Sequence, residues 1–496
     1  MRISLYKSIF FLTLAGHFPG FCQFESKQIL SKPDTSFSYL EVVGFGSTQT
    51  RVPFWIQANQ FGVVPKTNPG GSLRAGLQKF WNISDIDPQK SNWKFGVGIE
   101  AVGNGGSNFK FLLPQINATL KYKNWELFIG RKKTWVGLAD STLGTGSYVW
   151  SGNALPIPKI QLGTTHFVNV PLTKGWISFQ AFYSDGFFEK NRPITSGLKF
   201  HQKAFYLRLG KSSSQLKLYG GFNHQAQWGG NSPYNTAATN KLPDGFKNYI
   251  NVVTGKIGGN GTDQTFFDST SRIGNHLGSL DVAIEIETYE TSWFVYRQFI
   301  YEDGSLFYLK GIKDGLNGIR VRRKNSYGSN FEISEAVLEF LYTKEQGGDD
   351  FVLTDGKKRG RDNYFNNQQV RDGWSYYNRT IGTPFITPTS DTKWKWPNYA
   401  DNFTNNNRVS VLHLGLLGSM FQSITWYTKF SYSSNSGAYL EPFKGNPTQF
   451  SGFLALQTKL NILGGTLLKG SVAADIGDLY PKTYGFTLGL RKDFSF

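Results

Sequence analysis

The sequence predicts an all-β fold, a transmembrane antiparallel β-barrel, and three observations support this. Short segments such as Trp125–Arg131 alternate apolar and polar residues with the period of a strand. Aromatic residues and glycine are abundant, whereas the chain has only 2 methionines. Beyond the N-terminus, no stretch approaches the ~20 uninterrupted apolar residues of a spanning helix. Strands with one face toward lipid and the other toward water account for all three observations.

The N-terminus has the pattern of an export signal. Arg2 and Lys7 form a basic region, residues 9–15 are apolar, and small residues precede Gln23. We therefore expect a signal peptide over residues 1–22 and a single barrel domain over residues 23–496.

The chain has one cysteine, Cys22, directly before the expected cleavage point. Cleavage there would leave no disulfide, thiol nucleophile or cysteine metal ligand in the exported protein. A lipoprotein anchor on Cys22 is the alternative, although bulky Phe21 stands where a small residue is expected.

The C-terminal segment predicts a final membrane strand. Its apolar residues fall on alternate positions, and the chain ends in Phe: Tyr484, Phe486, Leu488, Leu490, Phe494 and Phe496. Such an end is typical of strands that outer-membrane barrels present to their assembly machinery, which predicts location in the outer membrane of a Gram-negative bacterium. The alternative is an ordinary amphipathic edge strand.

A meander in the middle of the chain predicts a ladder of charged residues toward the lumen. The alternation over residues 280–333 places carboxylates and guanidiniums opposite the apolar positions, namely Asp281, Glu285, Glu287, Arg297, Arg320, Arg322 and Glu332. One interpretation is that these charges neutralise each other and define the strand register. The other is a polar track that binds or conducts sugars.

Two tracts lose the strand periodicity and are predicted to be long extracellular loops. They cover residues 223–275 and 346–407, where Gly, Asn, Ser and other polar residues dominate. The first could cap the mouth of the barrel. The second carries several Trp and Tyr residues among Asp, Asn, Lys and Arg.

The charge balance favours anionic partners. Lys and Arg exceed Asp and Glu by 18, and an exported chain meets lipopolysaccharide phosphates and acidic polysaccharides rather than nucleic acid. The alternative is that the basic loops only dock onto lipopolysaccharide.

Enzymatic motifs are sparse. The histidines are dispersed, with neither an HExxH motif nor a G-x-S-x-G motif. Glu302 and Asp303 are adjacent and diverge, whereas a glycosidase needs two carboxyl groups that face one bond. We expect no catalysis, no cofactor and no metal site.

Several segments resemble the Wzi family of capsule-assembly proteins, especially its Bacteroidetes branch. They are GRKKTW at 130–135, WSGNALPIPK at 150–159, HQKAFY at 201–206, PFWIQANQFG at 53–62 and the meander YRQFIYEDGSLFYLKGIKDGLNGIRV. The resemblance implies a barrel of eighteen strands, closed to free diffusion, that acts as a lectin for capsular polysaccharide or exopolysaccharide. The periplasmic helices of enterobacterial members have no clear counterpart here, so glycan specificity is not carried over.

The predicted function is a monomeric, non-enzymatic barrel that anchors an anionic surface polysaccharide through aromatic and basic loop residues. Aromatic faces stack on sugar rings, and cations bind uronates or phosphates. The candidates are Trp150, Asn153, Trp228, Trp374, Tyr376, Arg379, Trp394 and Lys395. A channel for saccharides or other small solutes is the second hypothesis, and an outer-membrane enzyme is the third.

Overall fold

The computed structural model describes residues 36–83, 92–106, 109–235, 239–256, 272–302, 309–326, 328–350, 352, 360–395 and 402–494. The expected signal peptide, Asp303 and Phe496 lie outside these ranges.

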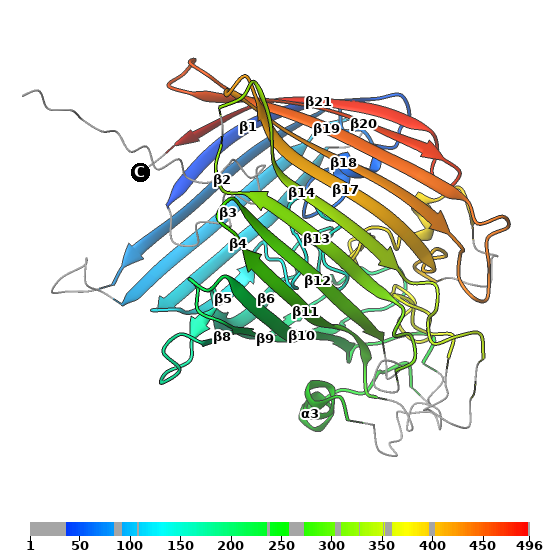
Figure 1. Cartoon of the computed structure of the whole chain (residues 1–496). Helices are drawn as coiled ribbons and strands as arrows, with labels where there is room; N and C mark the ends of the chain where they lie inside the picture. Colours follow the sequence, from blue (N-terminus) through cyan, green and yellow to red (C-terminus); the bar gives the residue numbers. More distant parts are fainter. Residues whose placement is uncertain are drawn as a thin grey trace, which may run out of the picture.

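Within the described residues, the chain forms a closed antiparallel barrel of eighteen wall strands, in which β6 and β7 both pair with β8 and count as one (Figure 1). The barrel closes because β1 pairs with β2 on one side and with β21 on the other. The predicted fold class is confirmed. The elements are β1 Phe37–Ser47, β2 Gly71–Asn82, β3 Trp93–Asn104, β4 Lys110–Tyr122, β5 Trp125–Arg131, β6 Lys159–Thr164, β7 Val168–Asn169, β8 Ile177–Phe187, β9 Lys199–Leu209, β10 Leu216–Trp228, β11 Asn275–Glu287, β12 Thr291–Glu302, β13 Gly315–Arg323, β14 Phe331–Tyr342, β17 Val409–Met420, β18 Ile424–Asn435, β19 Thr448–Leu460, β20 Thr466–Gly477 and β21 Thr483–Phe494.

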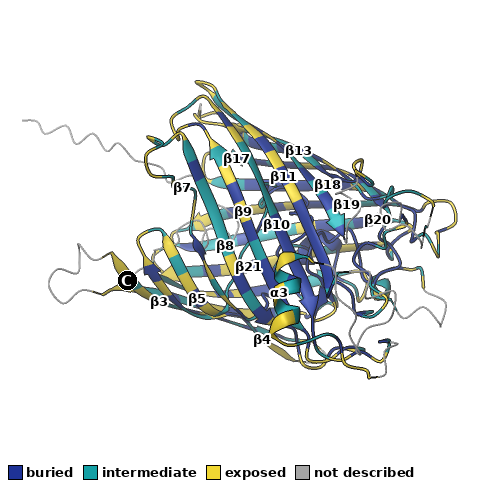
Figure 2. Cartoon of the chain, turned by 90° about the horizontal axis from the view of Figure 1, so that it is seen from below, coloured by how far each residue is buried: buried dark blue, intermediate teal, exposed yellow. Residues whose placement is uncertain are grey.

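Alternating exposure along the strands separates a lipid face from a lumen face (Figure 2). On β11, Leu280, Val282 and Ile284 are each more than 40% exposed, whereas the intervening Asp281 and Ala283 are buried. β21 follows the same pattern with Tyr484, Phe486, Leu488 and Leu490 outward. The apolar outer band is the surface that hydrocarbon covers in a transmembrane barrel.

The two ends of the barrel differ in their connections. At one end the strands are joined by short turns such as 123–124, 288–290 and 421–423, and β1 begins and β21 ends there. The other end carries the long connections, which gather on one side in Figure 1. In barrels of this class the short turns are periplasmic and the long loops extracellular.

The predicted loop at 223–275 begins later than expected. β10 continues to Trp228, and its last residues pair with Asn275, His276 and Leu277 of β11. The segment was missed because its wall positions are filled by Asn, His and Gln, which weaken the apolar alternation. Among the described residues, no helix is long and apolar enough to cross a membrane.

Candidate functional site

Three connections from the long-loop end turn into the lumen and form a plug, which we define as residues 48–70, 132–158 and 343–408. The first contains the short helix α2, Phe54–Gln57, whose residues are all buried. The backbone NH of Phe54 donates to Asp475 Oδ2 over 2.9 Å, and Trp55 Nε1 donates to Ser431 Oγ over 3.1 Å. The PFWIQ segment therefore lies inside the barrel against β18 to β20.

The second plug segment, 132–158, crosses the lumen from β5 and β6 to the opposite wall. Leu138 NH donates to Asp281 Oδ2 (2.8 Å), Thr145 NH to Glu339 Oε2 (2.5 Å) and Tyr148 NH to Gln298 Oε1 (3.0 Å). These acceptors lie on β11, β14 and β12, which are between four and eight strands round the wall from β5 and β6. Buried polar side chains of the wall thus accept hydrogen bonds from loop NH groups, and these bonds replace the ones to water that the loop loses inside the barrel.

The third segment, 343–408, begins at a buried carboxylate. Asp314 accepts hydrogen bonds from the NH groups of Glu345 (3.0 Å) and Gln346 (2.7 Å) and from the hydroxyl of Tyr364 (2.9 Å). Burial raises the pKa of Asp314 to about 6 although these donors oppose the shift. The carboxylate holds the point where the loop leaves the wall.

A second carboxylate ties this loop to the connection at 188–198. Asp372 Oδ2 accepts from Thr195 NH (2.7 Å) and lies 3.5 Å from Arg192 Nε, and both charged side chains are almost fully buried. Arg192 also donates to the carbonyl of Gly373 over 3.0 Å. Burial lowers the pKa of Arg192, and the nearby carboxylates oppose this.

The loop then forms a small hairpin, β15 Ser375–Tyr376 and β16 Arg379–Thr380, inside the plug. Arg379 Nη2 donates to the carbonyl of Val64 over 2.5 Å, so the hairpin is attached to the first plug segment. Burial lowers the pKa of Arg379 to about 10. The three plug segments therefore contact each other as well as the wall.

Six of the seven residues of the predicted charge ladder lie on the lumen side, and four of them lie within 4 Å of an oppositely charged side chain. Glu285 and Glu287 lie 3.4 and 3.6 Å from Lys217 Nζ, Arg320 lies 3.5 Å from Asp140 Oδ2 of the plug, and Arg322 Nε lies 2.9 Å from Glu335 Oε2. Asp281 is held by Leu138 NH and Gln298 Nε2, and Glu332 accepts from Ser326 Oγ over 2.6 Å. Such pairing is what the neutralising interpretation requires.

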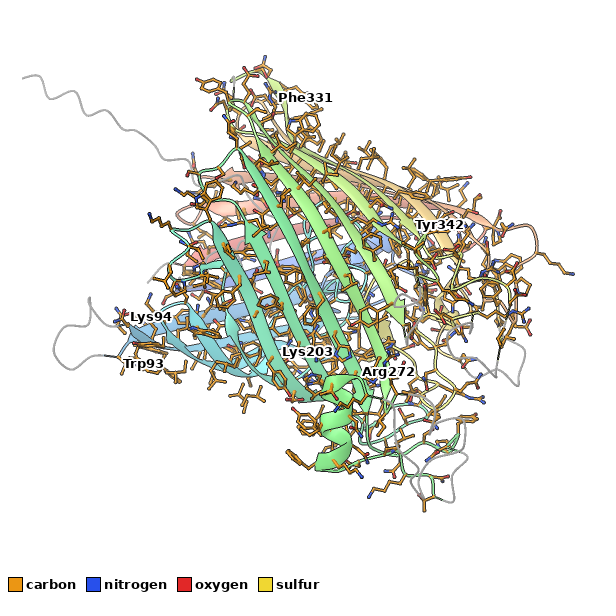
Figure 3. The ribbon with its side chains drawn as sticks, turned by 60° about the horizontal axis from the view of Figure 1, so that its bottom comes forward. Trp93, Lys94, Lys203, Arg272, Phe331 and Tyr342 are labelled. Carbon is orange, nitrogen blue, oxygen red and sulfur yellow. The ribbon has the colours of Figure 1, made fainter. Side chains whose placement is uncertain are left out.

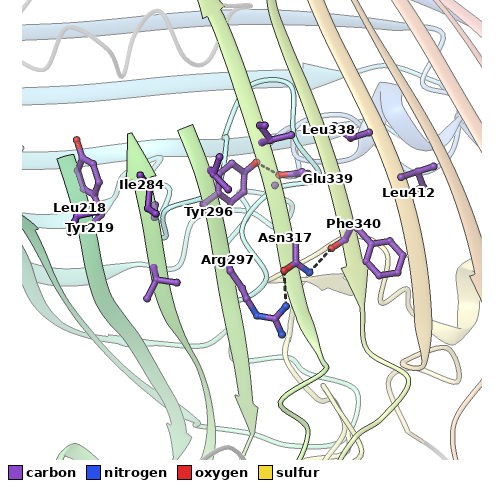
Figure 4. A pocket seen from close by; sticks show the side chains of 15 residues that line it. Leu218, Tyr219, Ile284, Tyr296, Arg297, Asn317, Leu338, Glu339, Phe340 and Leu412 are labelled. Atoms are coloured by element: carbon purple, nitrogen blue, oxygen red, sulfur yellow. Dashed lines mark hydrogen bonds between the residues drawn. The ribbon is translucent and has the colours of Figure 1, made fainter. Parts of the chain in front are cut away.

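The prediction that Arg297 faces the lumen is wrong. Arg297 lies on the outer face of β12 and donates to Asn317 Oδ1 over 2.6 Å, as Figure 4 shows, whereas Phe294, Tyr296 and Ile300 are buried inside. Both faces of this strand are apolar, because the inner one packs against the plug. Alternation alone therefore could not tell which face meets lipid.

Five of the predicted binding residues are buried in the plug: Trp150, Asn153, Trp374, Tyr376 and Arg379. Trp374 is fully buried, Trp150 stacks on Phe200 with ring centroids 5.6 Å apart, and Asn153 Nδ2 donates to the carbonyl of Thr380 over 3.0 Å. The expectation that Trp374 offers an exposed stacking face at the mouth is wrong. Aromatic residues in a polar tract here form the core of an inward-folded loop.

Trp228 lies outside the barrel rather than in the plug. It is covered by α3, Phe246–Thr254, which packs against the outer face of β10 (Figures 1 and 3). Tyr249 of this helix lies with its ring centroid 5.4 Å from that of Trp228, and Lys203 Nζ donates to the carbonyl of Val253. Trp228 is therefore a docking residue for α3.

Trp394 and Lys395 are the two predicted binding residues that stay accessible. Lys395 is exposed. Trp394 is half-buried, stacks on Phe443 with ring centroids 4.7 Å apart and donates from Nε1 to the carbonyl of Asp478 over 3.2 Å. The indole of Trp394 is thus held at the long-loop end by the connections at 436–447 and 478–482, and the exposed Lys395 follows it in the chain.

Sequence reasoning missed two further aromatic groups in the loops. Arg371 lies 3.5 Å above the ring of Tyr234, joining connections that are far apart in sequence. Tyr377 is 52% exposed, although its neighbour Tyr376 is buried. No sequence pattern distinguishes Tyr377 from Tyr376, because the difference arises from the turn of the hairpin. Within the described part of the chain, no group of three or more His, Cys, Asp or Glu residues could hold a metal ion.

We compared the chain with protein families, curated sequences and solved structures. Residues 84–413 match the family model "Capsule assembly protein Wzi". Among solved structures, the chain is similar to Wzi of Escherichia coli, described as an outer-membrane protein involved in group 1 capsule assembly and a carbohydrate-binding β-barrel. The TM-score is 0.59 at 16% identity, covering 95% of this chain and 87% of that one. OccK5 (OpdH) of Pseudomonas aeruginosa also aligns, with a TM-score of 0.44, 10% identity and coverage of 93% and 98%. No curated protein sequence matches.

Proposed function

Because the chain belongs to the capsule assembly protein Wzi family, we propose that this outer-membrane barrel holds a surface polysaccharide at its extracellular end. The E. coli relative, whose fold it shares, is described as carbohydrate-binding. The observation that carries the proposal is the combination of a plugged lumen with an aromatic and basic rim at Trp394 and Lys395. A plugged barrel favours retention over passage, and the rim offers what a sugar polymer needs: a flat apolar face beside a charge.

We propose that the polysaccharide is anionic and that the barrel acts without catalysis. The net charge of +18 supports an acidic ligand, and an exposed ammonium such as that of Lys395 suits uronate or phosphate groups. We propose that the barrel is a monomer, since β1 pairs with β21 and completes the wall within one chain. We also propose that the barrel assembly machinery inserts it into the outer membrane.

The test is a double variant at the rim, Trp394→Ala with Lys395→Ala. Each exposed contact contributes on the order of 1 kcal/mol, so we expect the double variant to release several-fold more polysaccharide into the medium at equal barrel abundance. The matched control is Trp176→Ala with Lys211→Ala. Trp176 is an exposed Trp with Lys211 Nζ 5.6 Å from its ring centroid, but at the short-turn end. Equal retention in both variants and the unmodified protein would exclude the rim at Trp394 as the binding surface.

A saccharide channel is the alternative, and the plug argues against it. One inner cavity, lined by Glu41, Arg74, Trp55 and Lys469, measures about 80 Å³, room for only a few water molecules. We expect no steady conductance from the unmodified protein in planar bilayers. Large, stable single-channel steps would favour the channel instead.

A further inference from the structure

The outer wall over β10 to β14 and β17 contains a groove of about 660 Å³ (Figure 4). Its outward side chains are mostly aliphatic or aromatic: Leu218, Val282, Ile284, Val295, Ile319, Leu338, Phe340 and Leu412. Arg297 and Asn317 are the polar outward residues among those lining it. The groove is therefore a lipid-facing hollow with one guanidinium in it.

Arg297 is only partly satisfied in this position. Its Nη1 and Nη2 donate to Asn317 Oδ1 and to the carbonyl of Ile312, each over 2.6 Å, and its guanidinium lies 4.5 Å from the centroid of the Phe299 ring. Its Nε is buried without a hydrogen-bond partner.

Two more cations, at the two ends of the 343–408 connection before it turns into the lumen, lie on the outer wall beyond the groove, toward the extracellular end. In the register of β14 and β17, Tyr342 pairs with Ser410, so the next outward position places Lys344 opposite Arg408. Arg408 Nε donates to the carbonyl of Lys344 over 3.2 Å, and Arg408 lies 3.8 Å above the ring of Tyr439. Lys344 Nζ donates to Ser434 Oγ over 3.0 Å. Tyr342, labelled in Figure 3, marks this end of the wall.

Within the described part of the chain, Lys344 and Arg408 form no ion pair with a carboxylate. Among the described residues, no Asp or Glu lies within ion-pair distance of Lys344, Arg408 or Arg297, although most lumen charges are paired. Two acidic residues lie in the same part of the chain as Lys344. Glu345 is paired with Lys313 Nζ at 3.0 Å, and Asp349 lies beside Tyr439. Two like charges held side by side repel each other, and a bound anion would relieve this.

We propose that this part of the wall binds lipopolysaccharide of the outer leaflet, with a phosphate between Lys344 and Arg408 and acyl chains in the groove. The position of the cations at the extracellular edge of the apolar band matches the level of lipid A phosphates. This site is separate from the polysaccharide rim, so it stands whether or not the proposed function does.

A second groove on the same lipid-facing surface provides an internal control. It measures about 730 Å³ and is lined by residues of β1 and β18 to β21, among them Phe430, Phe450, Leu454 and Phe486, with no charged residue. It offers acyl chains a similar hollow, but beside it lies Lys482, whose Nζ is 5.6 Å from the ring centroid of the lining residue Tyr484, rather than a pair of adjacent cations. Selective retention at the first groove is therefore expected to depend on the paired cations Lys344 and Arg408.

The experiment measures the lipopolysaccharide that stays bound to the full-length barrel after detergent exchange, by native mass spectrometry. We expect Lys344→Ala with Arg408→Ala to reduce retention at least tenfold. Lys211→Ala with Lys459→Ala, which removes two exposed charges at the short-turn end, and Phe450→Ala with Leu454→Ala, which alters the second groove, should retain it. Heat-modified migration on a gel establishes that each variant is folded.

Two further lipids test the assignment. Enzymatically dephosphorylated lipopolysaccharide should bind the unmodified protein and the Lys344/Arg408 variant equally weakly. Phosphatidylglycerol should be retained less than lipopolysaccharide by the unmodified protein. Undiminished lipopolysaccharide retention in the Lys344/Arg408 variant would overturn the proposal. So would phosphatidylglycerol retention that is as strong and as dependent on the two cations, because the site would then serve any anionic lipid.

Discussion

The two longest connections of the barrel, 229–274 and 343–408, have similar polar compositions but fold on opposite sides of the wall. The described part of the first lies outside, where α3 packs against β10, Trp228 and Tyr249. The second enters the lumen, where Trp374 and Tyr376 are fully buried. Loop composition therefore does not determine which way a loop folds.

What differs is the set of partners that the wall offers. The inward loop meets buried carboxylates, Asp314 and Asp372, that accept several hydrogen bonds each and satisfy a backbone removed from water. The outward loop has a more solvated attachment: Lys199 lies 2.5 Å from Asp244, and both side chains remain about 30% exposed. Breaking an exposed ion pair costs much less free energy than breaking a buried one. We therefore expect the plug to be held far more tightly than α3.

Asp372→Ala should give the largest effect. It leaves buried Arg192 with Glu189 as its nearby carboxylate but without Asp372, and breaking a buried pair typically costs about 3–5 kcal/mol. We expect the plug to detach from the connection at 188–198, giving flickering conductance in planar bilayers and new protease cleavage within 343–408. If the variant shows neither conductance nor new cleavage, the plug does not depend on the contacts of Asp372 with Arg192 and Thr195.

The matched change in the outer loop is Val252→Ala in α3. Val252 is fully buried against the wall, and removal of two methyl groups costs roughly 1.6 kcal/mol. Hydrogen exchange should become faster over Phe246–Thr254, with bilayer conductance unchanged. Conductance in this variant would mean that α3 supports the plug, and the two loops would then not be independent.

These two loops also mark the limit of what the sequence could predict. Barrel class and the faces of β11 and β21 followed from alternation, because one face of those strands is polar or glycine-rich. Arg297 was assigned to the wrong face because the inner side of β12 is apolar too, facing a plug that strand periodicity cannot predict. Burial of Trp374 likewise depends on Asp372 and Arg192, which lie 180 residues apart in sequence.

The attachment of the plug should weaken as pH rises. The pKa of Asp314 is about 6 with the loop attached, above the ordinary value of 3.8, so the attached state binds the extra proton. Its stabilising effect is complete below pH 3.8 and is lost as pH rises through 6. Between pH 5 and pH 7 the opening equilibrium should rise about tenfold. Gating frequency in bilayers measures this, and Asp314→Asn, which keeps a side-chain oxygen acceptor, should remove the dependence.

Asp244→Ala should give the smallest effect and is the counterpart of Asp372→Ala. The pair of Asp244 with Lys199 is partly exposed, so its loss should cost at most about 1 kcal/mol, and salt should reduce even that. Hydrogen exchange over α3 should rise slightly at low ionic strength and match the unmodified protein at high ionic strength. Complete undocking of α3 would show that this exposed pair, rather than Trp228, Tyr249 and Val252, holds the helix on the wall. The contrast between a polar anchor inside and an apolar anchor outside would then be wrong.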